Sequence, residues 1–251
     1  MRVLGISAVI LLLIVNLGWS QVDIPSAQTK LPAFRPILLG TGPESLINRI
    51  DTAGLVQQGQ KDGAVMFSCS VKKTGEVLSV STYRGTPGSK LLEQEILKKL
   101  SVAANPKFIP AVYNHIPVDA IYYGTVTFII VDDKPRLRIF SNQERTELEK
   151  ENDFISPQPF WGGDSKFSGL HYPNNESAPV PVDGAAELAL KVDATGNLQD
   201  LKVLSEQPPF LGFADAAFED FKKAKFIPAF RDGKPVACEV KIPVYYKGQG
   251  F

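Results

Sequence analysis

Hydrophobic and polar residues alternate along two neighbouring stretches in the second half of the chain. Residues 188–192 carry Leu, Leu and Val at every second position, and residues 198–203 carry a second apolar set. The sequence Asp-Ala-Thr-Gly between them, at 193–196, is typical of a tight turn. A period of two indicates strands with one buried face, so the pattern predicts a β-hairpin.

An amphipathic helix and a further strand are predicted after this hairpin. Apolar residues recur at helical spacing through residues 213–224, with acidic side chains early in the run and lysines late, as the helix dipole prefers. Pro228 then stops any helical continuation. Alternation returns over residues 236–244. The predicted order is therefore strand, strand, helix, strand.

The first half of the chain repeats this order. The matching pairs are Asp-Gly at 62–63 and 183–184, Thr-Gly at 74–75 and 195–196, and Lys-Phe-Ile-Pro-Ala at 107–111 and 225–229. A step of three from Leu198 to Leu201 breaks the alternation and recurs from Val77 to Val80, which predicts a bulge in both hairpins. The repeats of solenoid proteins are only about 20–50 residues long, and the matching pairs here lie much further apart in the sequence. The repeated unit is therefore a whole small domain.

The sequence thus predicts an α+β fold of two tandem ββαβ units. Each unit would be a three-stranded antiparallel sheet with one helix packed on one face. Phe160 and Trp161 are expected to pin the connection between the units, and a ligand contact of Trp161 is the open alternative. The predicted boundaries are a signal peptide or signal anchor at 1–20, an N-terminal extension at 21–61, a first unit at 62–130, a linker at 131–170 and a second unit at 171–247.

The N-terminus has the pattern of an export signal. Arg2 precedes an apolar run from Val3 to Leu17, and Gly18-Trp19-Ser20, with small residues at 18 and 20, offers a cleavage site ahead of Gln21. An uncleaved membrane anchor stays open, because the run is only just shorter than the roughly 17–25 residues of a spanning helix.

Charge and cysteine usage exclude several function classes. The chain has 27 basic and 27 acidic residues, so no net field attracts nucleic acid or an anionic membrane surface. Cys69 and Cys238 fall on the apolar faces of strands in different units, which predicts two unpaired core thiols rather than a disulfide.

The sequence offers no catalytic or metal-binding pattern. His115 and His171 are the two histidines, and neither has a catalytic partner evident from the sequence. The pair Asp132-Asp133 is interpreted as a solvated turn, and no metal-ligand spacing occurs. We therefore expect a protein that is not an enzyme and that uses no cofactor or metal.

The ordered series over residues 172–246 resembles the TonB C-terminal domain. Its parts are Tyr172-Pro173, Asp-Gly at 183–184, Asp-x-x-Gly at 193–196, the amphipathic helix, Phe-x-Pro-Ala at 226–229, Asp-Gly-Lys-Pro-Val at 232–236 and the final strand. The first unit resembles the same domain through its Asp-Gly, Thr-Gly and Phe-Ile-Pro-Ala sequences. It is a diverged copy, because it lacks the Asp-Gly-Lys-Pro turn.

This resemblance implies a periplasmic interaction module of a Gram-negative cell envelope. It would dock an extended segment of an outer-membrane transporter or another envelope protein. A three-stranded sheet leaves edge backbone groups free for such strand addition. By the family's pattern, the partner-binding residues would be Tyr172, Pro173, Val236, Cys238, Val240 and Ile242.

Two alternatives remain at this stage. An inner-membrane-anchored energy transducer would use the apolar run at the N-terminus, but Ser7 lacks the histidine of the family's Ser-x-x-x-His pattern and no long proline-rich spacer follows. A structural homodimer would pair the same free strand edges between two copies.

Overall fold

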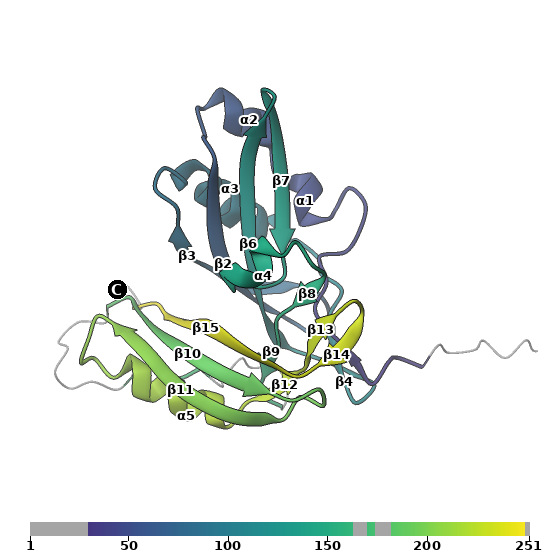
Figure 1. Ribbon diagram of the computed structural model, residues 1–251, viewed down its shortest axis with the longest axis vertical. Helices are drawn as coiled ribbons and strands as arrows, with labels where there is room; N and C mark the ends of the chain where they lie inside the picture. The colour runs from purple at the N-terminus through teal and green to yellow at the C-terminus, as the bar shows by residue number, and fades with distance from the viewer. Residues whose placement is uncertain (1–29, 163–169, 174–181, 249–251) are drawn as a thin grey trace, which may run out of the picture. The chain divides into compact units, whose positions relative to one another are not determined.

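The computed structural model describes residues 30–162, 170–173 and 182–248, and its elements are labelled in Figure 1. The predicted signal segment lies outside the described residues. The fold is α+β with mostly antiparallel sheets, as the sequence predicts. Leu31–Phe251 form one compact unit.

The first half of the chain forms a four-stranded sheet in the order β3-β2-β6-β7. Its strands are β2 (Gly63–Val71), β3 (Val77–Gly85), β6 (Ala120–Val131) and β7 (Lys134–Phe140), and helix α3 (Lys90–Leu100) packs on one face (Figure 1). Three strands were expected, and β7 is the additional one. It forms because Asp132 and Asp133, at φ of 50° and 58°, make a two-residue turn that returns the chain along β6.

The second half forms a three-stranded sheet in the order β11-β10-β15. Its strands are β10 (Gly184–Val192), β11 (Leu198–Gln207) and β15 (Cys238–Tyr246), and helix α5 (Phe213–Lys222) covers one face (Figure 1). Asp193 orders the hairpin turn, because its carboxylate accepts hydrogen bonds from the backbone N–H groups of Thr195 and Asn197. Hydrogen bonds from Thr195 and Asn197 lower the pKa of Asp193 to about 2.

The predicted bulge is confirmed in both hairpins. The register of β10 with β11 skips Gln199, and the register of β2 with β3 skips Leu78. A second irregularity also recurs, at Leu204 and Arg84. The two hairpins therefore share their departures from ideal pairing as well as their hydrophobic pattern.

A close backbone approach explains why the Thr-Gly and Phe-Ile-Pro sequences occur together in both halves. Gly75 and Gly196 have φ of 86° and 84°, a region that favours glycine. A Cβ at Gly75 would collide with the carbonyl oxygen of Phe108, and one at Gly196 would collide with that of Phe226. The hairpin turn thus packs against the segment after the helix in the same way twice.

Short elements connect the two larger sheets. They are β1 (Phe34–Arg35), α1 (Leu46–Arg49), α2 (Thr52–Gln57), the 3-10 helix η1 (Val102–Ala104), β4 (Ala111–Tyr113), β5 (Ile116–Val118), α4 (Arg145–Glu149), β8 (Phe154–Ile155), β9 (Gln158–Phe160), β12 (Lys225–Ile227), β13 (Ala229–Arg231) and β14 (Lys234–Val236). The small sheets run β1-β4-β5, β14-β13-β8 and β12-β9.

The segment predicted as a linker, 131–170, therefore contains β7, α4, β8 and β9, and two of these strands pair with the second half of the chain. The predicted domain boundaries themselves stay a prediction.

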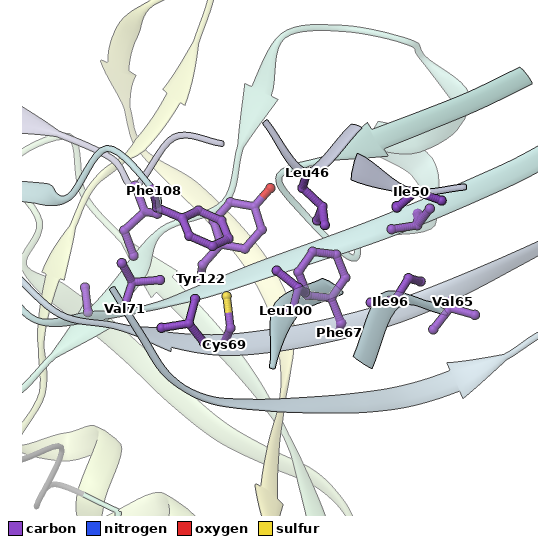
Figure 2. Packing of buried hydrophobic residues seen from close by; sticks show 14 of the residues in the cluster. Leu46, Ile50, Val65, Phe67, Cys69, Val71, Ile96, Leu100, Phe108 and Tyr122 are labelled. Atoms are coloured by element: carbon purple, nitrogen blue, oxygen red, sulfur yellow. The ribbon is translucent and has the colours of Figure 1, made fainter. Parts of the chain in front are cut away.

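Two hydrophobic cores fill the molecule, and each takes side chains from both halves. Figure 2 shows the first, in which Phe67, Tyr122 and Phe108 pack together beside residues of α3. This core also includes Ile227 and Phe230 from the second half. The second core lies under α5 and includes Ile121, Tyr123 and Phe154 from the first half and the connection. The two sheets consequently do not have independent interiors.

Candidate functional site

The last strand, β15, has one edge that no other strand of the described residues pairs with. Lys241 donates its backbone N–H to the Glu144 carboxylate at 3.4 Å, and Pro243 has no N–H, so both face away from β10. Backbone groups of an antiparallel strand point to alternate sides. The residues whose backbone groups face the open edge are therefore Glu239, Lys241, Pro243 and Tyr245.

A cleft of about 330 Å³ lies along the first half of this edge. The lining residues are Ala237, residues 238–241 of β15, Ala189 of β10, Glu144 with Thr146 and Glu147 of α4, Phe154 and Arg231. Its charged lining residues are Glu144, Glu147, Arg231, Glu239 and Lys241. The open backbone groups of β15 thus face a space with three carboxylates and two cations.

Glu147 and Arg231 form the fixed charge pair of the cleft. The Arg231 guanidinium lies 3.0 Å from the Glu147 carboxylate and stacks over the Phe154 ring at 4.9 Å. Burial alone would raise the pKa of Glu147, but hydrogen bonds from Asn152 and Lys150 and the charge of Arg231 together lower it. Lys150 lies 3.2 Å from the same carboxylate, so Glu147 has two cationic partners, and its pair with Arg231 joins α4 to β13.

Glu144 and Glu239 are different, because none of the ion pairs in the described part of the chain involves either of them. Glu144 occupies the N-cap position of α4, yet its side chain does not cap that helix. It reaches instead to the Lys241 N–H at the open edge. Glu144 therefore stands beside the free backbone of β15, whereas Glu239 lies opposite Lys191 of β10 in the sheet.

Four of the predicted partner-binding residues lie in or next to β15. Val240 and Ile242 are 3% and 1% exposed and pack in the core under α5. Cys238 and Val236 are half-buried, and Val236 pairs with Ala229 in β14-β13. Since Val240 and Ile242 alternate with Lys241, their backbone groups face β10. A partner strand at this edge would meet the neighbouring residues Glu239 and Lys241, which the sequence pattern does not single out.

The other two predicted residues, Tyr172 and Pro173, lie at the far end of the strand. The Tyr172 ring packs edge-on against Phe213 and against Tyr246, the last residue of β15. Its hydroxyl donates to the Val182 carbonyl and accepts from the Val182 N–H. Cys238 begins β15, so the six residues are spread along the length of one strand instead of forming a single cluster.

Both cysteines are unpaired, as predicted. Cys69 is buried in the first core, and burial raises its pKa well above the ordinary value. Cys238 is only half-buried and lines the cleft. Burial raises its pKa to about 12, so the thiol stays protonated at neutral pH.

His171 has a hydrogen-bond partner that the sequence does not reveal. Its Nδ1 lies 2.7 Å from Oδ1 of Asp220, and its backbone N–H donates to Oδ2 at 2.6 Å. Asp220 is buried on α5, and its carbonyl accepts the Trp161 indole N–H at 2.9 Å. Asp220 thus holds the chain before Tyr172 against α5. No serine or cysteine of the described residues hydrogen-bonds to His171.

Trp161 packs as the first of its two interpretations predicts, with its ring edge-on to Phe221 at 5.5 Å. Within the described ranges, no group of three or more His, Cys, Asp or Glu residues could hold a metal ion. Within those same ranges, no helix has both the length and the apolar character that crossing a bilayer requires.

An antiparallel sheet with a helix on one face and a free strand edge is an architecture to which an extended partner strand can be added. Residues 169–247 match the family model described as Gram-negative bacterial TonB protein C-terminal, and this part of the chain is a TonB C-terminal domain. No curated protein matches the chain. The match begins at residue 169, so the first sheet lies outside it.

The family is a non-enzymatic interaction domain of the Gram-negative envelope, and its members interact with outer-membrane transporters. The match supports a TonB-like role in energy transduction in that envelope. It does not cover the first sheet or the residues of α4 that line the cleft.

Proposed function

We propose that this protein is a periplasmic docking module that binds an extended segment of an outer-membrane transporter, or of another envelope protein, by strand addition to β15. One observation carries the proposal. The outward backbone groups of Glu239 and Lys241 face a cleft, while the side chains of Val240 and Ile242 hold the strand in the core. A rigid edge strand with free backbone groups is the usual template for β-augmentation.

The six residues predicted from the sequence keep supporting roles in this proposal. Val240 and Ile242 anchor the strand, Val236 and Cys238 begin it, and Tyr172 with Pro173 packs at its far end. The backbone groups of Glu239 and Lys241 are the ones that would hydrogen-bond directly to the partner strand.

Replacing Lys241 with Pro tests the proposal. The change removes a backbone N–H that faces away from β10, so the sheet keeps its ladder while a partner strand loses a donor. We expect the full chain to fold normally and to bind extended peptides from outer-membrane transporters at least about tenfold more weakly, the equivalent of one lost hydrogen bond of about 1.4 kcal/mol. Fluorescence anisotropy would measure the affinity.

Two further variants make this test specific. Lys241→Ala removes the same side chain but keeps the N–H, and it should bind like the wild type. Val240→Pro removes a donor directed at β10 and should unfold the domain, which circular dichroism would report. Equal binding by Lys241→Pro and Lys241→Ala would contradict strand addition at β15.

A strand-paired homodimer is the second candidate function, and β11 favours it. This strand is the other edge of the sheet, and its Val203 and Leu204 are exposed. Pairing between two copies through β11 would leave β15 free for a partner. An anchored transducer would use the apolar run from Val3 to Leu17 as its membrane anchor, and this run lies outside the described ranges.

A further inference from the structure

We infer, on the basis of the proposed strand addition to β15, that the contact of Glu144 with Lys241 is autoinhibitory. The Glu144 carboxylate occupies the backbone N–H that a partner strand would take. A partner would bind only in those molecules in which Glu144 has left this N–H. The chain would thus regulate access to its own docking edge.

The third strand of each unit has one edge turned away from its own hairpin. In the first unit this strand is β6, and the whole of β7 (Lys134–Phe140) pairs with that edge. Leu137 and Ile139 of β7 also pack against the first core, which fixes the pairing. In the second unit the third strand is β15, and no strand of the described residues pairs with its outer edge. The chain therefore closes the first edge with a strand of its own and leaves the second without one.

The segment that closes the first edge continues to the second. Soon after β7 ends, Glu144 takes the N-cap position of α4 and lines the cleft with Thr146 and Glu147 (Figure 1). Its carboxylate accepts the Lys241 N–H at 3.4 Å. This N–H faces away from β10, so a partner strand at the edge needs the same donor. Glu144 and an arriving backbone carbonyl therefore compete for one hydrogen bond.

The contact is weak enough to be displaced. A distance of 3.4 Å lies beyond the roughly 2.7–3.2 Å of most N–H···O hydrogen bonds. None of the residues of α4 is buried, so little hydrophobic contact holds this helix in place. The ion pairs of Glu147 with Arg231 and Lys150 need not break, because only the Glu144 side chain has to turn away. Autoinhibition here would lower the affinity for a partner without abolishing it.

Removing the Glu144 side chain tests the inference. Glu144→Ala should keep α4, because this side chain does not cap the helix and the Glu144 carbonyl still accepts the N–H groups of Glu147 and Leu148. We expect the full chain with this change to bind a capped heptapeptide of alternating Thr and Val about three- to tenfold more tightly. The reason is that an occupied edge lowers the apparent affinity by the fraction of molecules in which it is free. Anisotropy of the labelled peptide measures this change.

Two matched variants separate competition from charge. Glu144→Gln loses the charge but keeps an acceptor oxygen at the same reach, so its affinity should stay close to that of the wild type. Glu149→Ala, on the same helix but absent from the cleft lining, should bind like the wild type. An equal gain in Glu144→Gln and Glu144→Ala would assign the effect to charge and overturn the inference. No gain in Glu144→Ala would overturn it as well.

A coupled pair of variants ties the effect to one donor. In the Lys241→Pro background the N–H is missing, so adding Glu144→Ala should not change the affinity for the peptide. A gain that persists in this background would come from another contact, and autoinhibition through Lys241 would be rejected.

Amide exchange in the free protein tests the contact without any partner. By NMR, the Lys241 amide should exchange faster in Glu144→Ala than in the wild type. The amides of Val240 and Ile242 face β10 and should keep their rates. Equal Lys241 rates would overturn the autoinhibition and leave strand addition at β15 untouched. Faster exchange with no peptide binding by any variant would reject strand addition, and the regulatory role with it.

Discussion

At the scale of single residues, Phe210 departs most clearly from the usual distribution of side chains. It is 92% exposed and has φ of 65°, a region that a bulky residue seldom adopts. The backbone around it is held by Glu206, whose carboxylate accepts the N–H groups of Leu211 and Phe213. The loop between β11 and α5 is therefore fixed, and Phe210 bears its strain without gaining burial.

Replacing Phe210 with Gly should stabilise the protein. Relief of the left-handed backbone conformation is worth about 1–2 kcal/mol, and the greater freedom of glycine in the unfolded chain offsets about half of it. We expect a net gain of roughly 0.5–1 kcal/mol in the free energy of unfolding, measured by urea denaturation. Phe210→Ala is the control, because it removes the ring but keeps the Cβ. An equal gain in both variants would show that the ring, and not the backbone, is unfavourable.

At the scale of elements, the two edges of the second sheet differ in their protection. The β15 edge is lined by charged residues and contains Pro243, two features that limit unwanted strand pairing. The β11 edge exposes Val203 and Leu204 instead. The β11 edge is therefore less protected than the β15 edge and is better suited to pairing with a second copy of the chain.

Pairing through β11 predicts a mass that depends on concentration. Sedimentation equilibrium should show the wild type approaching twice its monomer mass as concentration rises. Leu204→Lys places a charge on the edge and should keep the chain monomeric. Leu78→Lys, at an equally exposed position of the first sheet, should behave like the wild type. A monomeric wild type at every concentration would exclude this dimer.

The elements that the sequence predicts well are those governed by local patterns. Alternation around Leu188 and Leu190 identifies β10, and the step from Leu198 to Leu201 marks the bulge correctly. The strand β7 was missed because its turn, Asp132-Asp133, resembles a simple solvated turn in the sequence. The contact of Glu144 with Lys241 joins positions 97 residues apart, and no periodic pattern records such a pairing.

At the scale of the whole molecule, the connection between the two sheets is part of the structure. Strands β8 and β9 lie before the TonB C-terminal match and pair with β13 and β12 inside it. Ile121, Tyr123 and Phe154 complete the core under α5. The matched segment alone therefore lacks partners that it uses in the full chain.

An isolated fragment of residues 169–247 should be markedly less stable than the full chain. Each large side chain missing from its core contributes about 1.5–3 kcal/mol when buried. For a domain of this size we expect the melting temperature to fall by more than about 10 °C. A fragment of residues 152–251 retains β8 and β9 and should recover part of the loss. Amide exchange in β10 that is equally slow in the 169–247 fragment and in the full chain would contradict this expectation.

Pro243 limits how long a bound strand can stay. Because it offers no N–H at the open edge, and Tyr245 beyond it is packed against Tyr83, the run of β15 available for pairing is short. Few backbone hydrogen bonds mean fast dissociation, and affinity is controlled mainly by that rate. Docking at this edge would be a brief contact, suited to repeated capture and release of a partner rather than to permanent assembly.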